Sequence, residues 1–460
     1  MNDFRETLYT VDKRGHRKWV YSDIVKGRFF KLRAIVAYTL MAFYLLMPWI
    51  SINGKQAILL DIPSRKFIFF GTTFWATDTM FLFLVLGGLG ISLFLFTAMF
   101  GRVWCGWACP ETVFLEFLFR PIERLIEGSR AERMRLDKAP WSFNKIAKKS
   151  LKHLLCAVLS WVIASTALAY FIGREPLLNM MTDWPGHHPL PFVMTLIIMG
   201  LMAFQFGWFR EQFCTVLCPY ARFQSVLMDA DTITVGYDQV RGEPRGKLAR
   251  KSEENNRGDC IDCKLCIRVC PTGIDIRNGN QLECISCTAC IDACDFIMEK
   301  IGRPKGLIRY DTENRLYGRP GRFLRPRVFV YSVILLAFIG SFFTLLEKRA
   351  LTEFQILRGT VASPFILQPD GNVTNQLRVH VSNKSEQVES YTFSSPASGV
   401  KLITPLSPFK LKAGEIREVP LFVTFSKDRL KDGKFRLKII LNGSSGYKGE
   451  QEITLLGPDE

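Results

Sequence analysis

The stretch Cys260-Ile-Asp-Cys-Lys-Leu-Cys-Ile-Arg-Val-Cys270 is repeated in pattern at Cys284-Ile-Ser-Cys-Thr-Ala-Cys-Ile-Asp-Ala-Cys294. Both copies read C-x2-C-x2-C-x3-C, which is the spacing that holds [4Fe–4S] clusters in bacterial ferredoxins. Zinc sites also use paired cysteines, but this longer spacing, present twice, favours iron–sulfur clusters. The pattern therefore predicts a protein that transfers electrons one at a time.

The spacing also predicts how the two clusters share their ligands, because the fourth cysteine of each such run binds the other cluster. We expect one cluster on Cys260, Cys263, Cys266 and Cys294, and the other on Cys284, Cys287, Cys290 and Cys270. The first run ends in Cys270–Pro271, as in ferredoxins, whereas the second ends in Cys294–Asp295. Since every sulfur ligand remains, we interpret this departure as a local change beside one cluster.

Much of the 460-residue chain is predicted to lie in a membrane. Five stretches carry no charge and are near the roughly 20 apolar residues that cross a bilayer. They are Ala34 to Ile50, Phe81 to Phe100, Leu154 to Ile172, Leu190 to Phe209 and Val328 to Leu346. Polar and basic residues precede the first stretch and no small-residue cleavage site follows it, so we expect an uncleaved anchor rather than a signal peptide.

The distribution of basic residues predicts the orientation in the membrane. Forty Lys and Arg residues lie before the first span, between Arg102 and Lys152, and between Arg210 and Arg327. The two other short loops hold four, at Lys55, Arg65, Lys66 and Arg174. By the positive-inside rule the basic segments face the cytoplasm of a bacterial inner membrane. This accounts for most of the net charge of +17, so no nucleic-acid partner is expected.

The segment that follows the fifth span is predicted to lie on the periplasmic side. Alternating residues such as Gln376-Leu-Arg-Val-His-Val381 and the turn signals Asp370–Gly371, Asp432–Gly433 and Asn442–Gly443 predict short strands. An immunoglobulin-like sandwich fits this length and pattern.

The predicted fold is therefore mixed: a five-helix transmembrane bundle, a cytoplasmic ferredoxin-like α+β insert with two clusters, and an all-β C-terminal sandwich. The expected parts are a cytoplasmic segment at 1–33, four spans at 34–209 with a basic cytoplasmic loop at 101–153, the ferredoxin-like domain at 210–327, a fifth span at 328–346 and the periplasmic domain at 347–460.

Two further cysteine pairs match each other at the ends of the second and fourth spans. Both read C-x3-C-P, in Cys105-Gly-Trp-Ala-Cys-Pro110 and in Cys214-Thr-Val-Leu-Cys-Pro219. On a helix, residues i and i+4 share a face, so each pair is expected to aim two sulfurs the same way until the proline ends or kinks the helix. If the spans are neighbours, Cys105, Cys109, Cys214 and Cys218 form one thiol site. Thiolates select Cu(I), zinc or iron–sulfur clusters, and a redox-active dithiol is the alternative.

With these motifs in this order, the chain resembles nearly end to end the cytochrome c oxidase accessory family CcoG, also called FixG or RdxA. The most specific parts of the resemblance are CGWACP at 105–110, CTVLCP at 214–219 and the cysteines from Cys260 to Cys294. The resemblance implies a role in assembling a cbb-type haem–copper oxidase, by reduction of Cu(II) to Cu(I). It implies that Cys105, Cys109, Cys214 and Cys218 are the catalytic, copper-contacting group and that two [4Fe–4S] clusters supply it with electrons.

The leading hypothesis is a membrane-bound cupric reductase that takes electrons from an unidentified cytoplasmic donor. Its expected partners are the lipid bilayer and the oxidase assembly machinery or a copper carrier. One alternative is a non-catalytic assembly scaffold that docks oxidase subunits through the C-terminal sandwich. The other, shared with NapH- and NosR-like membrane ferredoxins, is a carrier of quinol electrons.

Overall fold

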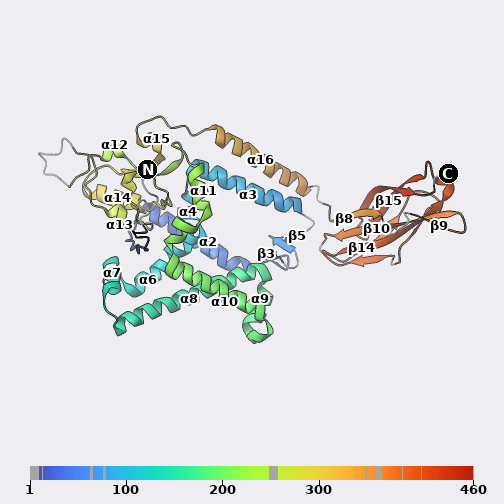
Figure 1. The fold of residues 1–460 in the computed structure, drawn as a ribbon, viewed down its shortest axis with the longest axis horizontal. Coiled ribbons are helices and arrows are strands. Elements are labelled where there is room, and N and C mark those ends of the chain that lie inside the picture. The colour runs from blue at the N-terminus through green and yellow to red at the C-terminus, as the bar shows by residue number, and fades with distance from the viewer. Residues whose placement is uncertain are drawn as a thin grey trace. The chain divides into compact units, whose positions relative to one another are not determined.

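The structure is a computed structural model, and it describes residues 10–12, 14–62, 66–75, 79–247, 257–347, 350–358, 365–385, 387–405 and 407–458. Residues 1–9 of the predicted N-terminal segment and Arg65 of a predicted loop lie outside this set. The chain forms two compact units (Figure 1). The first holds most residues up to Ser341, and the second holds those from Phe342 onward with short pieces between 65 and 79.

Among the described residues, five helices are long and apolar enough to cross a membrane, the same number as the apolar stretches in the sequence. They are α2 (Arg28–Leu46), α3 (Thr79–Phe100), α8 (Phe143–Ile172), α10 (Pro189–Phe204) and α16 (Pro326–Glu347). The apolar stretch of α10 continues through the π-helical segment η4 (Gln205–Phe209). In α16 only 6% of the apolar stretch is buried within the protein, against 44% in α8. Large exposed apolar surfaces of this kind mark contact with a membrane or another protein.

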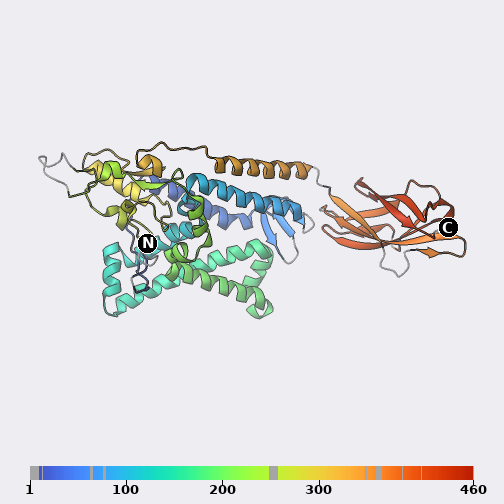
Figure 2. The same cartoon turned by 45° about the horizontal axis from the view of Figure 1, so that its top comes forward.

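The helices of the first unit pack in two groups. In one group α8 lies along α10, and side chains of α2 join their core, where the rings of Phe119 and Phe206 stack with centroids 4.6 Å apart. In the other group α3 lies beside α16 in both Figure 1 and Figure 2. The ring centroids of Phe83 and Phe338 are 5.9 Å apart there.

The segment predicted as a basic loop at 101–153 is mostly helical. Its elements are α4 (Val103–Trp107), α5 (Pro110–Phe114), the π-helical η2 (Leu115–Phe119), α6 (Arg120–Glu127) and α7 (Arg130–Lys138). Helix α8 also begins well before the apolar run predicted from Leu154. The reason is a cap, because the Ser142 hydroxyl accepts a 3.3 Å hydrogen bond from the Lys145 backbone N–H.

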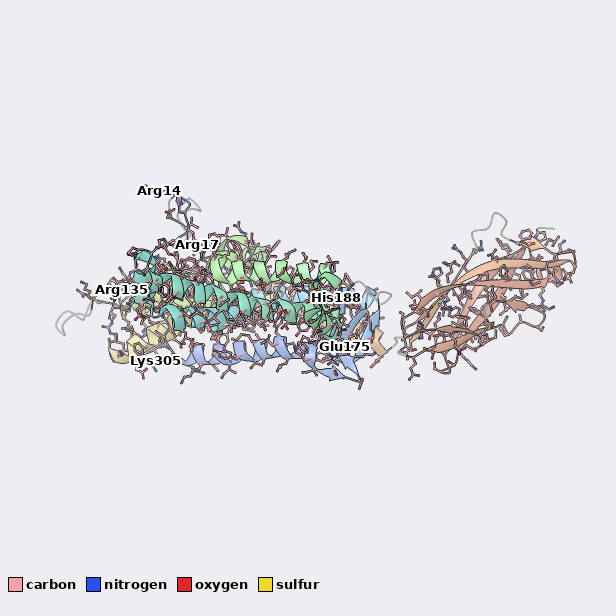
Figure 3. All side chains as sticks on the ribbon, turned by 90° about the horizontal axis from the view of Figure 1, so that it is seen from below. Arg14, Arg17, Arg135, Glu175, His188 and Lys305 are labelled. Carbon is pink, nitrogen blue, oxygen red and sulfur yellow. The ribbon has the colours of Figure 1, made fainter. Side chains whose placement is uncertain are left out.

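Short elements fill the connections at the other end of the helices, where none was predicted. After α2 come η1 (Met47–Trp49), β1 (Ser51–Ile52), β2 (Lys55–Gln56), β3 (Ile58–Asp61), β4 (Lys66–Phe69) and β5 (Thr72–Trp75). Between α8 and α10 lie α9 (Arg174–Thr182) and η3 (Pro185–His187). Figure 3 shows Arg135 and Lys305 at one end of the helical unit, with Glu175 and His188 at the opposite end. Residues of the segment at 101–153 and of the ferredoxin-like region thus lie at the same end of the helical unit.

The region between α10 and α16 has the duplicated layout of a two-cluster ferredoxin. Strand β6 (Ile233–Tyr237) pairs antiparallel with β7 (Ile308–Thr312), in a register that places Val235 opposite Tyr310. Two helices, α13 (Leu265–Arg268) and α14 (Ala289–Lys300), each begin between the second and third cysteines of a run. The remaining elements are η5 (Phe213–Leu217), α11 (Pro219–Leu227), α12 (Gln239–Gly242), η7 (Ile276–Asn278) and α15 (Glu313–Leu316). The cysteines lie against a core that both halves of this duplication share.

The second unit contains two antiparallel sheets around one apolar core, as expected for the C-terminal sandwich. One sheet has the order β12-β14-β10-β8, with β9 also paired to β10, and the other has the order β13-β11-β15-β16. The strands are β8 (Thr352–Arg358), β9 (Ile366–Leu367), β10 (Asn372–Asn383), β11 (Glu389–Ser394), β12 (Lys401–Ile403), β13 (Phe409–Leu411), β14 (Ile416–Ser426), β15 (Lys434–Gly443) and β16 (Lys448–Leu456). Asp370–Gly371 and Asp432–Gly433 lie at turns, but Asn442–Gly443 forms the end of β15.

Candidate metal centres

The ferredoxin-like region contains two cavities, each lined by the four cysteines predicted to bind one cluster. The cavity that we call distal has a volume of about 370 Å³, and its cysteines are Cys260, Cys263, Cys266 and Cys294. The proximal cavity has a volume of about 340 Å³, and its cysteines are Cys270, Cys284, Cys287 and Cys290, together with Cys266, which lines both cavities. Each cavity thus brings together the four cysteines that the spacing assigned to one cluster.

The backbone around the first three cysteines of each run has the same unusual conformation. Asp262 and Lys264 in one run, and Ser286 and Thr288 in the other, have φ between 52° and 63°. Residues other than glycine seldom adopt this left-handed backbone conformation. Alternation of right- and left-handed residues turns successive N–H groups toward one concave side, which is a common anion and iron–sulfur cradle. The two runs are therefore built alike at the level of single residues.

The chemistry of the cavities fits iron–sulfur clusters. Burial raises the pKa of Cys266 to about 12 and the pKa of Cys284 to about 11, so these thiols lose their protons readily only to a metal. Within the described residues, no group of three or more His, Cys, Asp or Glu side chains is arranged to hold a single metal ion.

The C-x3-C-P motifs do not lie on one continuous helix, so the predicted i, i+4 arrangement was wrong. Cys109 and Cys218 are extended links, with ψ of 127° and 112°, and Pro110 and Pro219 each begin a new helix. The residue before a proline prefers extended backbone, and a proline in the first helical position loses no intrahelical hydrogen bond. The proline thus starts a helix beyond the second cysteine of each motif.

Even so, the four cysteines of these motifs, here called the edge cysteines, lie near one another, although among the described residues no three of them are arranged around one metal position. Cys105 packs against Cys287 of the proximal cavity, and Cys214 packs against the same small cluster of side chains. Burial raises the pKa of Cys214 well above its ordinary value, and the neighbouring Cys109 and Cys105 raise it further. Burial also raises the pKa of Cys105, with a further increase from Cys218. The edge cysteines are therefore a group of neighbouring thiols, of which Cys105 is buried and the other three are partly exposed.

The segment from Cys105 to Pro110, here called the edge motif, contacts the loop that carries the proximal ligands. Gly106 permits this contact. A Cβ atom at Gly106 would lie 2.5 Å from the Ile285 carbonyl oxygen and 2.8 Å from the backbone nitrogen of Cys287. Two hydrogen bonds extend the contact, because Trp107 Nε1 donates to the Tyr310 hydroxyl at 2.9 Å and that hydroxyl donates to the Ser286 carbonyl at 3.0 Å. The motif and the cluster loop are thus held together by backbone and side-chain contacts.

Three further residues of this site were not identified from the sequence: Gly106, Arg33 and Gln224. Arg33 is only 5% exposed, and its Nε donates a 3.0 Å hydrogen bond to the Gly106 carbonyl. Gln224 Oε1 accepts from the Cys105 thiol at 3.2 Å and from Arg102 Nε at 3.1 Å. The glycine between the cysteines of CGWACP was the one available signal, since a side chain is absent where two backbones approach.

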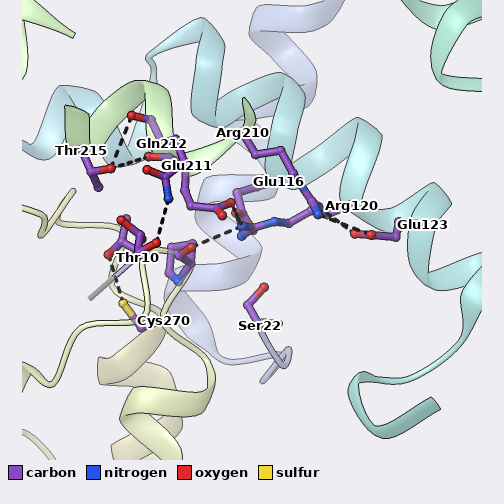
Figure 4. Close-up of polar contacts among 12 residues, drawn as sticks. Thr10, Ser22, Glu116, Arg120, Glu123, Arg210, Glu211, Gln212, Thr215 and Cys270 are labelled. Carbon is purple, nitrogen blue, oxygen red and sulfur yellow. Dashed lines mark hydrogen bonds and ion pairs between the residues drawn. The ribbon is translucent and has the colours of Figure 1, made fainter. Parts of the chain in front are cut away.

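A buried network of charges lies beside this group, because Arg120 and Glu211 line a small cavity together with Cys214. Figure 4 shows this network with the proximal ligand Cys270. Arg120 is 1% exposed, pairs with Glu116, and contacts Glu211 at 3.1 Å through Nη2. The same nitrogen donates to the Pro271 carbonyl at 3.3 Å, directly after the proximal ligand Cys270. The network therefore joins the helices after α3, the segment after α10 and the cluster-binding loop.

Glu123 is the centre of a second part of this network. Its Oε2 lies 2.7 Å from Nη2 of Arg210 and 3.3 Å from Nη1 of Arg133. Burial acts to raise the pKa of Glu123, but Arg210, Lys152 and Arg133 lower it to about 2. The carboxylate is therefore ionised at neutral pH.

Comparison with known proteins identifies two iron–sulfur regions and the C-terminal domain. A protein-family model described as a 4Fe-4S dicluster domain matches residues 209–313, and one described as a 4Fe-4S binding domain matches residues 79–128. A third, described as an IG-like fold at the C-terminus of FixG, matches residues 342–458. The cysteines within 79–128 are Cys105 and Cys109.

Several curated proteins are similar over most of the chain. Nitrogen fixation protein FixG of Rhizobium meliloti is 32% identical, over 96% of this chain and 94% of its own. Protein RdxA of Cereibacter sphaeroides is 39% identical over 78% of each chain, and protein RdxB of the same organism is 37% identical over 82% of each.

Proposed function

Because the chain belongs to the FixG family of iron–sulfur proteins, we propose that it is a membrane electron-transfer protein that reduces Cu(II) to Cu(I) at the edge cysteines. The observation that carries this proposal is the contact of the edge motif with the proximal cavity. Cys105 and Gly106 pack on Cys287, so an electron held at the proximal ligands has a short path through packed atoms to the thiols. The eight cysteines of the two runs are assigned to the clusters, and the edge cysteines to the substrate.

Each part of the site has a separate task. The clusters supply one-electron transfer when bound, through Cys260, Cys263, Cys266 and Cys294 in the distal cavity and Cys270, Cys284, Cys287 and Cys290 in the proximal cavity. Each Cu(II) ion that becomes Cu(I) takes up one electron. The edge thiols suit the product, because thiolates favour Cu(I) whereas Cu(II) favours nitrogen and oxygen ligands. Thiol protons are released when the copper ion binds.

The proposed setting is a bacterial inner membrane with the clusters on the cytoplasmic side. The five apolar helices and the basic residues at one end of them support this orientation. The C-terminal sandwich is then periplasmic. Cu(I) made at the cytoplasmic face is suited to delivery, through a copper carrier, to a cbb-type oxidase during its assembly, and the reducing electrons come from a cytoplasmic donor.

The match of an iron–sulfur family to residues 79–128 favours a second candidate for the edge cysteines. Since Cys105 and Cys109 are the cysteines of that region, the edge cysteines can instead hold a third iron–sulfur cluster. In that case they are an intermediate electron carrier and copper is not their substrate. Thiolates serve both metals, so metal content decides between the two candidates.

The test uses the full chain, purified without oxygen, and a variant with Cys105, Cys109, Cys214 and Cys218 all changed to serine. We expect iron for two clusters in both proteins, with a Cu(I)-specific chelator reporting copper reduction by the unaltered protein alone. Cys156→Ala is the matched control, because Cys156 is buried in α8 away from both cysteine groups. Loss of one cluster's iron in the quadruple variant would support the third-cluster candidate, and undiminished copper reduction would contradict the proposed site.

A further inference from the structure

Arg33 is a buried cation at the junction between α2, the edge motif and the proximal cavity. Its Nε donates to the Gly106 carbonyl, and its guanidinium carbon lies 5.4 Å from the centroid of the Phe117 ring. In the described part of the chain, its Nη2 has no hydrogen-bond partner and no carboxylate lies within ion-pair distance of it. A buried arginine normally has a partner for each donor, so this donor is free for a group that the protein atoms do not supply.

Two of the three carboxylates that share a cavity with Arg33 have other partners. Glu116 pairs with Arg120. Asp292 accepts from the backbone N–H groups of Phe29 and Phe30 at 3.1 Å and 2.7 Å, which caps the first turn of α2. Asp23 is the third acidic residue of this cavity. The positive charge of Arg33 is therefore not neutralised by a direct ion pair there.

A second buried arginine, Arg102, lies beside the proximal ligand Cys284, and the two line one pocket. Arg102 is 3% exposed and donates to the Leu282 carbonyl and to Gln224, which are uncharged partners. Arg33 approaches the proximal ligand Cys287 through Gly106, whose carbonyl accepts from Arg33 and whose backbone packs on that of Cys287. Glu283, next to Cys284, is also buried but is not an ion-pair partner of Arg102.

The distal cavity differs, because its arginine is neutralised. Arg277, which lines it, forms ion pairs of 2.5 Å with Asp262 and 2.7 Å with Asp275. Asp295, which replaces the proline expected after Cys294, adds a negative charge beside that ligand and accepts a 2.9 Å hydrogen bond from the Gly306 backbone N–H. The buried arginine at the distal cavity is therefore compensated, and Lys264, which also lines that cavity, is exposed to solvent. By contrast, the buried Arg33 and Arg102 near the proximal ligands have only uncharged hydrogen-bond partners among the described residues.

From this asymmetry we propose that Arg33 holds the reduction potential of the proximal cluster above that of the distal cluster. Reduction adds a negative charge to a buried cluster, and a nearby cation stabilises that charge. Electrons that enter the distal cluster then move toward Gly106 and the edge cysteines. Cys263 is exposed, so water also stabilises the reduced distal cluster, and the arginines outweigh this effect. Arg33 thus acts through its charge on the reduction potential of the proximal cluster, and it is not itself a cluster ligand.

The proposal rests on the ligand assignment made under Proposed function, but its test needs no copper. The reduction potentials of both clusters are measured by redox titration with electron paramagnetic resonance, in the full-length protein and in Arg33→Gln and Arg33→Lys. In Arg33→Gln we expect the equilibrium constant for moving an electron from the distal to the proximal cluster to fall at least about tenfold, which is about 59 mV for one electron. Arg33→Lys keeps the charge and should keep most of the difference.

Two controls separate charge from structure. Arg174→Gln removes the cation next to Glu175 in α9, and Glu175 lies at the opposite end of the helical unit (Figure 3). This change should leave both potentials unchanged. Asp295→Asn should raise the reduction potential of the distal cluster and so decrease the difference between the two potentials. If Arg33→Gln does not retain both clusters, this variant tests the same asymmetry of charge. The proposal would be overturned by an unchanged proximal potential in Arg33→Gln with the signals of both clusters present. It would also be overturned if Arg33→Lys decreased the difference between the two potentials as much as Arg33→Gln does. If the potentials behave as expected but no copper is reduced, the proposed substrate fails and the role of Arg33 stands.

Discussion

The two groups of cysteines are assembled in opposite ways. The cluster ligands lie within one stretch of the chain, where left-handed residues such as Asp262 and Ser286 shape each loop locally. The edge cysteines come from two segments far apart in sequence, and they meet only because both segments pack on the loop of Cys287. Local spacing therefore defines the electron carrier, whereas tertiary packing defines the site that receives the electron.

The largest effect is expected from a change that removes a proximal ligand. Cys287→Ser takes away a proximal ligand and the residue on which Cys105 packs, so it should lose the proximal cluster and nearly all copper reduction. Iron analysis and cluster spectra measure the first loss, and Cu(I) formation measures the second. Full copper reduction with the proximal cluster absent would show that the edge cysteines do not depend on it.

The next largest effect tests the contact between the two groups without removing any sulfur. Gly106→Ala places a Cβ atom against the backbone of Ile285 and Cys287, so the edge motif must move away from the cluster loop. Copper reduction should slow roughly tenfold or more, as small misplacements in reactive sites do, while the iron content stays the same. Gly88→Ala in α3 is the matched control, because open space surrounds that position. Equal rates of copper reduction in Gly106→Ala and Gly88→Ala would show that the edge cysteines do not depend on contact with the cluster loop.

A smaller effect, on stability rather than chemistry, is expected in the charge network that holds both groups together. Glu123→Gln leaves Arg210, Arg133 and Lys152 without their shared carboxylate, which should cost about 3–5 kcal/mol of unfolding free energy. Thermal unfolding measures this cost, with the exposed Glu299→Gln as the control near zero.

The same carboxylate predicts a dependence of stability on pH. The pKa of Glu123 is about 2 in the folded protein and about 4.5 ordinarily, so its contribution is present above the ordinary value. The contribution should be lost as the pH falls through this range toward 2, because the unfolded chain binds the proton first. The acid sensitivity of unfolding should therefore be weaker in Glu123→Gln, and an identical pH profile would contradict the role given to the network.

The smallest effect is expected from deletion of residues 352–460. That segment is a sandwich with its own core and contributes none of the cysteines, so cluster content and copper reduction in purified protein should remain. A non-catalytic scaffold would instead lose its partner. Loss of reduction after this deletion would show that the sandwich takes part in electron transfer.

The parts predicted best from the sequence depend on local pattern. Apolar runs gave the five long helices, alternation gave the strands around His380, and cysteine spacing gave the groups that line the two cavities. The burial of charged side chains between Arg102 and Ser142 was missed, because carboxylates and arginines look like part of a solvated segment until their ion pairs are seen.

The contacts that join the two cysteine groups were also missed, for a physical reason. Arg33 lies at the end of a basic stretch that resembles an ordinary membrane flank, and its hydrogen bond to Gly106 spans distant parts of the chain. The same holds for Gln224 beside Cys105. The i, i+4 expectation failed because each proline begins a helix, which places the cysteine before it in an extended link.

The central claim is that electrons pass from the clusters to copper through the edge cysteines, and a single-turnover measurement tests it most directly. Protein with chemically reduced clusters is mixed rapidly with Cu(II), and cluster absorbance is followed together with Cu(I) formation. The claim predicts that the oxidised cluster spectrum returns with one Cu(I) formed per electron, and that neither change occurs when Cys105, Cys109, Cys214 and Cys218 are serine. Equally fast oxidation of the clusters by Cu(II) in that variant would contradict it.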